Sequence, residues 1–315
     1  MNTTISKLPQ EFHLLAFSIS ADYQLLLFSG VLLIYSLAII GNVAIISIVC
    51  FVSQLHTPMY AFICNLSVQD ILYVSVILPK LLTITISGDP SISGIFCITQ
   101  EYLFTFCIET EFLLLSFMSY DRYVAICLPL RYCTIMNNKT CALLASTAWV
   151  IAAIDSLQLS LLISDSSFCK SKEINHFFCD LKAILKLSCS DTTNIKNMIF
   201  IQGTIIGVLP FLLILTSYAI IICNIMQIRT SAGKVKAFSS CSSHLTVVLL
   251  FCGTSLSLYM IPEATHSEEQ DKLLSLLYVA VVPMLNPLVY SLRNKEVLTA
   301  FKNLYIFLKG KLSNT

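Results

Sequence analysis

The chain has 315 residues, with 19 Lys and Arg against 18 Asp and Glu, and a formal net charge of +1. Charged residues make up 12% of the chain and apolar residues 56%, whereas a typical soluble domain is about 25% charged. This composition excludes a disordered chain, which needs low hydrophobicity and high charge. It also excludes a water-soluble globular protein, whose surface needs more polar side chains. The near-neutral charge gives no indication of nucleic-acid binding, so we predict a polytopic membrane protein.

Seven apolar stretches are long enough to cross a bilayer as helices, which takes about 20 residues. They lie at 24–52, 57–86, 95–127, 140–163, 194–228, 238–261 and 271–292. The alternating pattern of a transmembrane barrel is absent from the sequence, so the spans are predicted to be helical. The expected fold is an all-α membrane protein, with one seven-helix bundle forming a single domain over residues 1–315.

The distribution of Lys and Arg predicts the orientation of the bundle. If the N-terminus is outside, the inner ends of the spans are enriched in basic residues and the outer loops carry most of the acids. Residues 1–23 are then an extracellular N-terminus, and the sequon at Asn2 is a glycosylation site. No cleavable signal peptide is expected, so the first span should direct insertion.

Residues 294–308 follow the last span and have apolar side chains at helical spacing, including Val297, Phe301 and Leu304. Lys295 and Lys302 lie among them. Such a segment is typical of an amphipathic helix on a membrane surface, and its lysines favour anionic lipids. We expect this helix to contact the inner leaflet.

Thirteen cysteines are an odd number, so they cannot all pair. Cys97, Cys169, Cys179 and Cys189 fall on the predicted outer, oxidising side. Four cysteines allow three pairings, and the residues alone leave that choice open. The remaining nine are expected to be small buried side chains. The outer loop near 164–193 is long enough to act as a lid over the bundle once bridges hold it.

Charged side chains inside spans are costly, and each is a functional candidate. Those in the predicted spans are Asp70, Glu109, Glu111, Asp121, Arg122 and Asp155. Asp70 and Glu111 fall at similar depth, so they can share a proton or hold a small cation such as sodium. Alternatively, both are protonated and hydrogen-bonded to neighbouring hydroxyl groups. Glu109 precedes Glu111 by two residues, a rotation of about 200° on a helix, so these two carboxyls should face different neighbours.

Four short strings narrow the family. They are LHTPMY at 55–60, MSYDRYVAIC at 118–127, KAFSSCSSHL at 236–245 and PMLNPLVYSLRN at 283–294. In this order and spacing they resemble the vertebrate odorant receptors, a branch of the rhodopsin-like G-protein-coupled receptors. The resemblance extends over essentially the whole chain.

The resemblance implies the disulfides Cys97–Cys179 and Cys169–Cys189. It implies a receptor, not an enzyme, that binds a small odorant and activates the stimulatory olfactory G protein to raise cyclic AMP. The chain should lie in the plasma membrane of sensory cilia, with no nucleic acid as a partner and no cofactor other than a structural sodium ion at Asp70 and Glu111. The residues expected to switch the G-protein face are Asp121, Arg122, Tyr218, Asn286, Pro287 and Tyr290.

By matching position, one set of residues should line the ligand pocket: Phe104, Thr105, Ile108, Glu109, Gln202, Ile206, Ser255, Tyr259 and Val279. The chain departs from the family pattern at Cys252, where a Tyr is usual. Phe104 stands where amine receptors have an Asp, so an amine held by that salt bridge is not expected. We hypothesise that Glu109 makes a polar or cationic contact with the odorant.

Two further functions compete with odorant detection. The chain can instead be a chemosensory receptor for a small metabolite outside olfaction. A membrane transporter is the more distant alternative, because transporters show internal repeats that this sequence lacks. An intramembrane enzyme is disfavoured since the five histidines lie near span ends or in loops.

Overall fold

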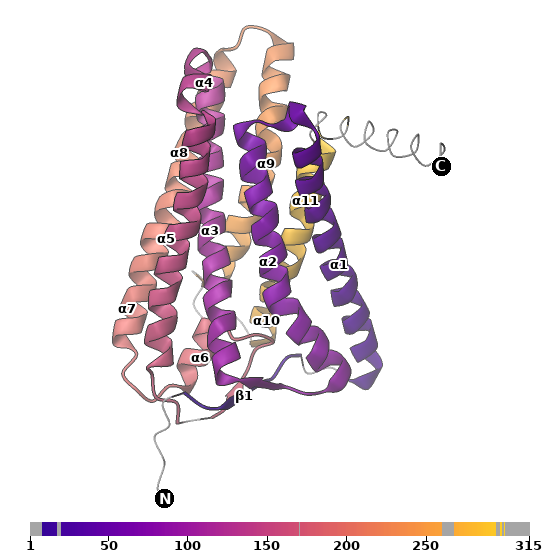
Figure 1. Cartoon of the computed structure of the whole chain (residues 1–315), viewed down its shortest axis with the longest axis vertical. Coiled ribbons are helices and arrows are strands. Elements are labelled where there is room, and N and C mark those ends of the chain that lie inside the picture. The colour runs from indigo at the N-terminus through magenta and orange to yellow at the C-terminus, as the bar shows by residue number, and fades with distance from the viewer. Residues whose placement is uncertain are drawn as a thin grey trace, which may run out of the picture.

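The computed structural model describes residues 8–17, 20–169, 171–259 and 268–293, together with residues 297 and 299. Long helices run side by side along the longest axis of the molecule, and a small sheet lies across one end (Figure 1). The long helices without a π-helical turn are α1 (Ala21–Phe51), α2 (Pro58–Ser87), α3 (Gly94–Cys127), α5 (Asn138–Ser164) and α9 (Ser231–Tyr259). The shorter connecting elements are η1 (Ser53–Leu55), η2 (Pro129–Arg131), α4 (Tyr132–Ile135) and α6 (Leu181–Leu187).

Two further spans are helices interrupted by π-helical turns. The fifth span runs through α7 (Thr193–Gln202), η3 (Gly203–Val208) and α8 (Leu209–Gln227). The seventh runs through α10 (Glu268–Leu276), η5 (Leu277–Val281) and α11 (Val282–Arg293). Within the described residues, six spans are long and apolar enough to cross a membrane. The bent helix α9 makes a seventh when its two halves count as one span. The predicted helical membrane bundle is confirmed.

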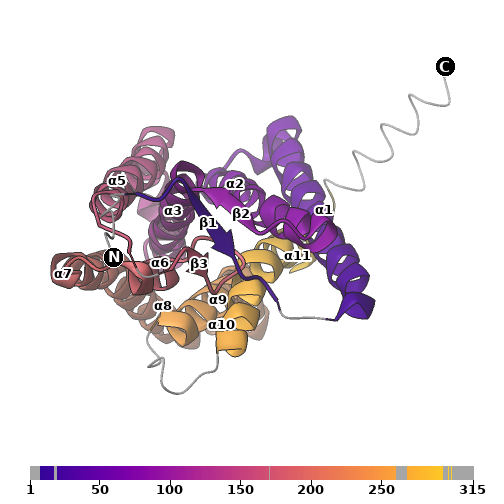
Figure 2. The same cartoon turned by 90° about the horizontal axis from the view of Figure 1, so that it is seen from below.

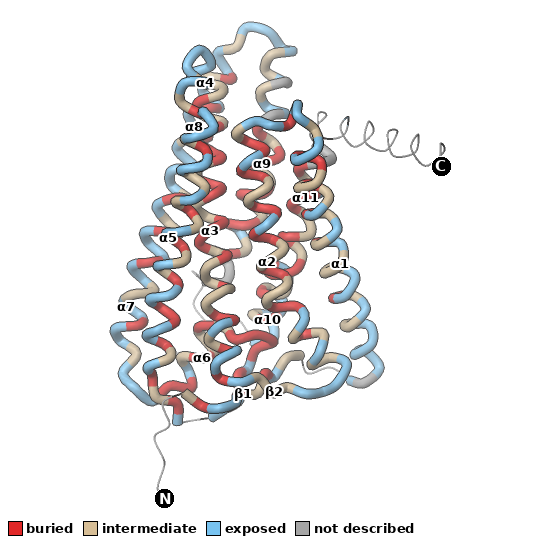
Figure 3. Tube along the Cα trace, in the orientation of Figure 1, coloured by how far each residue is buried: buried red, intermediate tan, exposed pale blue. Residues whose placement is uncertain are grey.

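The burial pattern follows from apolar residues on every face of the helices. Buried positions face inward between the helices, and exposed positions face outward (Figure 3). Large apolar side chains stay exposed on the outer surface, such as Leu25 at 74% and Phe200 at 76%. A helix that is hydrophobic all round is typical of a membrane span, because lipid covers the face that other helices leave open. Helix α3 lies in the middle and packs against α2, α5, α8 and α9.

The ends of the helices follow local sequence signals. Helix α2 begins with Pro58 in its first turn and ends at Gly88, whose φ of 71° is easily adopted only by glycine. Helix α5 begins after Asn137, whose side chain accepts the backbone N–H of Thr140 at 3.0 Å. These are the polar and turn-forming residues that separate the apolar stretches in the sequence.

Prolines explain the two π-helical turns. Pro210 cannot donate a backbone hydrogen bond, and the turn before it widens, so that the N–H of Leu209 bonds to the carbonyl of Thr204. In the seventh span the N–H of Val282 bonds to the carbonyl of Leu277, just before Pro283. The two spans thus accommodate these prolines through i→i+5 turns, which occur often at functional sites.

The sheet at one end of the bundle was not predicted. Strand β1 (Glu11–Leu14) pairs antiparallel with β2 (Ser91–Ser93) and parallel with β3 (Glu173–Ile174). Seen from below, the sheet crosses the end of the bundle (Figure 2). We call this end the disulfide end, because Cys97 and Cys179 lie there, and the other the Arg122 end. Residues 8–17, which belong to the predicted extracellular N-terminus, are thus built into the fold.

Two predictions fall outside the described residues. These are the glycosylation site at Asn2 and, apart from residues 297 and 299, the amphipathic helix at 294–308.

Candidate functional site

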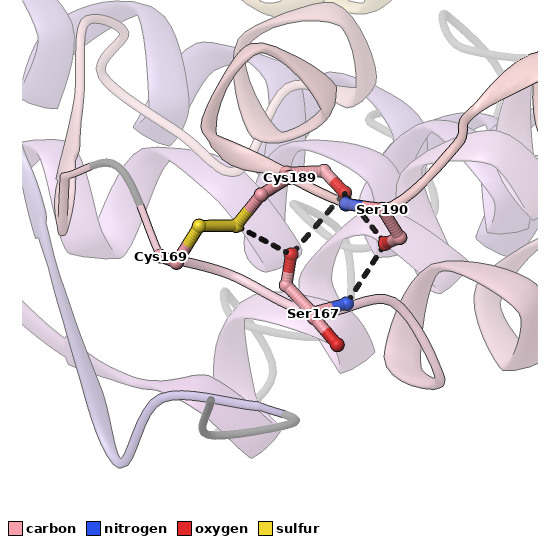
Figure 4. Close-up of a disulfide and its surroundings, with 5 residues drawn as sticks. Ser167, Cys169, Cys189 and Ser190 are labelled. Carbon is pink, nitrogen blue, oxygen red and sulfur yellow. Dashed lines mark hydrogen bonds between the residues drawn. A yellow bond between two sulfur atoms is a disulfide. The ribbon is translucent and has the colours of Figure 1, made fainter. Parts of the chain in front are cut away.

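The long loop between α5 and α7 is fixed to the bundle by both expected disulfides. Cys97 in the first turn of α3 is bonded to Cys179, with 5.4 Å between the Cα atoms. Cys169 is bonded to Cys189 within the loop (Figure 4). Two backbone N–H groups form hydrogen bonds beside this second bridge. The N–H of Cys189 donates to the carbonyl of Ser167, and the N–H of Ser167 donates to the hydroxyl of Ser190, each at 3.0 Å. The pairing that the residues alone left open is therefore confirmed as the family resemblance implied.

Gln100 fixes the position of the loop relative to the bundle through two hydrogen bonds. Its Oε1 accepts the backbone N–H of Cys179 at 2.9 Å, and its Nε2 donates to the carbonyl of Val76 in α2 at 2.9 Å. The side chain is only 6% exposed. A single buried amide therefore connects α2, α3 and the loop, and sequence reasoning did not identify it.

A cavity of about 120 Å³ lies between this loop, α3 and the seventh span. Its apolar floor consists of Phe104, Phe178, Tyr278 and Val279, all 3% exposed or less. The ring centroids of Phe104 and Phe178 are 4.7 Å apart. The volume suits a molecule with about one ring, since a 150 Å³ apolar cavity accommodates benzene. This is the composition expected of a small-molecule site, mainly apolar with few polar groups.

His176 and Ser275 are the buried polar side chains that line the cavity, each 6% exposed. The imidazole Nε2 of His176 lies 3.3 Å from the Ser275 hydroxyl and links the loop to α10. Burial lowers the pKa of His176 from 6.5 to about 4; the carboxylate of Asp180 acts in the opposite direction, and the Lys272 ammonium lowers it further. His176 is therefore uncharged at neutral pH. Sequence reasoning set it aside as a loop residue.

The rim of the cavity is charged. Among the described residues it carries the acids Glu173, Asp180, Glu268 and Asp271 and the bases Lys182 and Lys186. The amide of Asn175 donates to Glu268, a second link between the loop and α10. The loop therefore covers the apolar floor as the predicted lid would, with acids in excess at its edge.

Two of the predicted pocket residues, Phe104 and Val279, line this cavity. Several of the other predicted pocket residues contact groups outside this cavity. Thr105 donates to Glu101 at 3.0 Å, and Ser255 donates to the carbonyl of Phe251 within its own helix at 2.8 Å. Ile108 packs against the apolar core, and Ile206 is buried in η3. The side chain of Tyr259 lies outside the described part. Ligand contact for these residues stays a prediction.

Glu109 faces α5 instead of this cavity. Its carboxyl lies within hydrogen-bonding range of Asp155, and Gln202 donates to the backbone carbonyl of Asp155 at 3.1 Å. Two carboxyl groups can bond to each other only if one carries a proton, so the pair is held by a shared hydrogen. The hypothesis of an odorant contact at Glu109 would therefore require this pair to open first.

Asp70 and Glu111 come together in the middle of the bundle. Asn286 of α11 donates to Asp70 at 3.0 Å and is also within reach of Glu111. Gln69 donates to Oε2 of Glu111 at 3.4 Å. Glu109 and Glu111 do face different neighbours, as the helical geometry predicted.

At the Arg122 end, Asp121 holds Arg122 in place. Their Oδ2 and Nη2 atoms are 2.5 Å apart, and Nε of Arg122 lies 3.0 Å from the same oxygen. The hydroxyl of Tyr132, in the connection after α3, donates to the other Asp121 oxygen at 2.8 Å. Burial and the Asp121 charge raise the pKa of Tyr132, so it stays a donor. Sequence reasoning named Asp121 and Arg122 but missed Tyr132.

Tyr218 and His244 link the fifth and sixth spans near the same end. The Tyr218 hydroxyl lies 2.6 Å from Nδ1 of His244, and both side chains are buried. Between α8 and α9 lies an apolar groove of about 530 Å³ that includes Tyr218, Ile225 and Leu245. Tyr290 and Cys252 are buried in the helical core. Of the predicted switch residues, Tyr218 lines this groove.

The comparisons with known proteins agree with this architecture. A family model described as olfactory receptor matches residues 31–307. Olfactory receptor 2T11 of Homo sapiens is 40% identical over 295 residues, which cover 94% of this chain and 93% of the relative. Olfactory receptor 1E16 of Mus musculus is 43% identical over 302 residues, 96% of each chain. Olfactory receptor 1E2 of Gorilla gorilla gorilla is 45% identical over 287 residues, 91% of each.

The helical membrane bundle has a lid fixed by disulfides and a small apolar cavity at one end, and an Asp–Arg pair at the other. Together these features define a receptor of the G-protein-coupled class. The family match and the identities then place the chain within it: it belongs to the olfactory receptor family. It is a multi-pass membrane protein that functions as an odorant receptor.

Proposed function

We propose that the chain detects a small odorant in the cavity beneath the loop and activates a stimulatory, olfactory-type G protein, which raises cyclic AMP. The observation that carries this proposal is the pairing of the covered apolar cavity at the disulfide end with the Asp121–Arg122 pair at the other. Release of Arg122 and widening of the groove between α8 and α9 would admit a helix of the G protein. Family membership favours this function over a transporter.

A cyclic AMP reporter assay tests the proposal. Cells that express the receptor with the stimulatory olfactory G protein should respond to at least one odorant of a broad panel. An Arg122→Ala variant at equal surface expression should lose that response. A response that requires an inhibitory G protein, or one that survives the loss of Arg122, would contradict the coupling we propose. A cyclic AMP response to metabolites alone would favour the non-olfactory chemosensory alternative.

We further propose that the disulfide end is extracellular, in the plasma membrane of sensory cilia, with Asn2 glycosylated and residues 294–308 on the inner leaflet. Both disulfides lie at one end of the bundle, which supports this orientation because disulfides persist in oxidising compartments. An epitope at the N-terminus should then bind antibody on intact cells. Labelling only after permeabilisation would reverse the orientation.

Sodium at Asp70 and Glu111 is also proposed. The residues present fit a hard cation, because Oε1 of Glu111 and Oδ1 of Asn286 are buried oxygens without a hydrogen-bond partner in the described structure. Oδ1 of Asn42 is a third such oxygen; its side-chain amide donates to the carbonyl of Pro283 in the seventh span at 3.1 Å. A bound ion would balance a carboxylate charge between the second, third and seventh spans. Replacing potassium chloride with sodium chloride should raise the melting temperature of the purified receptor, and Glu111→Gln should abolish that difference.

A further inference from the structure

The cavity beneath the loop has one polar group whose hydrogen-bonding capacity is half used. Nε2 of His176 is paired with Ser275, whereas Nδ1 is buried and has no partner in the part of the chain that the structure describes. Buried polar atoms in folded proteins are nearly always paired. The ring itself is fixed by stacking on Phe177, with centroids 4.8 Å apart, and by an edge contact with Phe178 at 4.4 Å. A rigid ring with one unused nitrogen therefore borders a ligand-sized space.

The electrical charge of the site limits which ligands it accepts. His176 is neutral at neutral pH, since burial and the nearby Lys272 oppose its protonation more than Asp180 favours it. The Lys272 ammonium is buried and already paired with Glu269 at 2.9 Å. An anionic ligand would pass a rim with more acids than bases. A cationic ligand would find Phe104 and other apolar side chains on the floor, where its charge would lose water without gaining a counter-ion.

We infer that His176, held by Ser275, is a specificity-determining residue that binds an uncharged hydroxyl or carbonyl group of the ligand, while the hydrocarbon part packs on Phe104, Phe178 and Tyr278. The inference rests on the proposed function, in which this cavity holds the odorant. It adds a chemical class: small neutral molecules with about one ring and a single oxygen function.

The Ser275 hydroxyl lets one imidazole serve both kinds of oxygen. When the hydroxyl donates to Nε2, the proton of His176 resides on Nδ1 and can be donated to a carbonyl oxygen. When Nε2 carries the proton and donates to Ser275, Nδ1 becomes an acceptor for a ligand hydroxyl. The two states differ in the rotation of the Ser275 O–H bond and in which ring nitrogen carries the single imidazole proton. A hydrocarbon can use neither state, and an ion bonded to Nδ1 would still lose its hydration without gaining a counter-ion.

Ligand-induced stabilisation of the purified full-length receptor tests the inference without a G protein. The probes are toluene, benzaldehyde, benzyl alcohol, benzoate and benzylamine, which share one ring and differ in the polar group. Apparent affinities follow from the melting temperature as a function of probe concentration. A hydrogen bond should make benzaldehyde and benzyl alcohol bind about 2- to 12-fold more tightly than toluene. Benzoate and benzylamine should bind more weakly than either.

His176→Phe keeps the stacked ring but removes both nitrogens, so it should bring the three neutral probes to similar affinities. His13→Phe is the matched control, because His13 lies in β1 outside the cavity lining and its variant should keep the wild-type ranking. If His176→Phe does not fold, Ser275→Ala decides: it should change the ratio of benzaldehyde to benzyl alcohol affinity without changing that of toluene.

Three results would overturn the inference: no stabilisation by any probe, equal or tighter binding of toluene or the ions, or a ranking that neither cavity variant alters. These outcomes are separable from failure of the proposed function. Stabilisation with the expected ranking but without cyclic AMP would reject the coupling and keep the subsite. A cyclic AMP response whose probe ranking ignores His176 would reject the subsite alone.

Discussion

Acidification should destabilise this receptor through His176, and the size of the effect follows from its burial. The pKa of His176 is lowered from 6.5 to about 4 in the folded chain. Above pH 6.5 the ring is neutral in both the folded and unfolded states, so it contributes no pH dependence there. Between pH 6.5 and pH 4 the unfolded chain binds a proton that the folded chain does not. The free energy of unfolding therefore falls as the pH falls through this window.

One pKa unit corresponds to about 1.4 kcal/mol, so the full displacement is worth about 3.5 kcal/mol, of which about 2.5 kcal/mol is lost by pH 4.5. The chain has a single tryptophan, Trp149, whose indole donates to Asn65 at 2.8 Å, so its fluorescence reports unfolding. Thermal unfolding at pH 7 and pH 4.5 should show a larger loss of stability for wild type than for His176→Phe.

Carboxyl groups elsewhere in the chain also respond to acid. The quantity to compare is therefore the loss of unfolding free energy in wild type minus the loss in His176→Phe. It should be about 2.5 kcal/mol at pH 4.5 and close to zero at pH 7. Parallel loss of stability in wild type and His176→Phe would refute the reasoning. So would a wild type that gains stability on acidification relative to the variant.

Three further predictions concern the packing and the switch. Gln100→Leu leaves the loop's backbone N–H unpaired, which should cost about 1–3 kcal/mol in thermal unfolding of the purified receptor. Gly41→Val should strongly reduce surface expression, because a Cβ at Gly41 would lie 2.8 Å from a proline ring carbon of α11, whereas Gly30→Val meets nothing and should be tolerated. Tyr132→Phe removes a hydrogen bond to Asp121, so cyclic AMP without odorant should rise at equal surface expression; an unchanged basal signal would show that this bond does not restrain the switch.

The sequence was sufficient for the features that depend on local composition. Seven apolar stretches predicted the spans, and turn residues such as Pro58, Gly88 and Asn137 marked their ends. The disulfides needed the family resemblance, because four cysteines are compatible with three pairings. The structure then confirmed Cys97–Cys179 and Cys169–Cys189.

The sheet could not be predicted because its partners are far apart in sequence. Strand β1 near residue 12 pairs with segments near residues 92 and 174, and no local pattern encodes such a contact. Its buried residues, Phe12 and Leu14, are only two apolar positions in a mixed segment. Their burial depends on the position of the loop, which the disulfides and Gln100 determine.

The ligand site was predicted only in part because adjacent residues of a helix face different neighbours. Phe104 and Thr105 are about 100° apart on α3, so a small rotation decides which of them lines the cavity. The structure places Phe104 there and turns Thr105 towards Glu101. His176 was missed for a different reason: a loop residue gains a role only when its loop folds back over the bundle, and the only local signal was the pair of phenylalanines that follows it.

The in-span acids now divide by the partner that each has. Asp121 is paired with a cation, whereas Glu109 and Asp155 face each other and Glu101 is bonded to the hydroxyls of Thr105 and Ser160. A bilayer offers no water to screen adjacent negative charges, so carboxyl groups in contact must share a proton. The charged and acidic groups inside the spans thus have two different roles. We propose that the Asp121–Arg122 pair separates when the groove opens, whereas the proton-sharing pair between α3 and α5 joins two helices without requiring a lysine or arginine in the membrane.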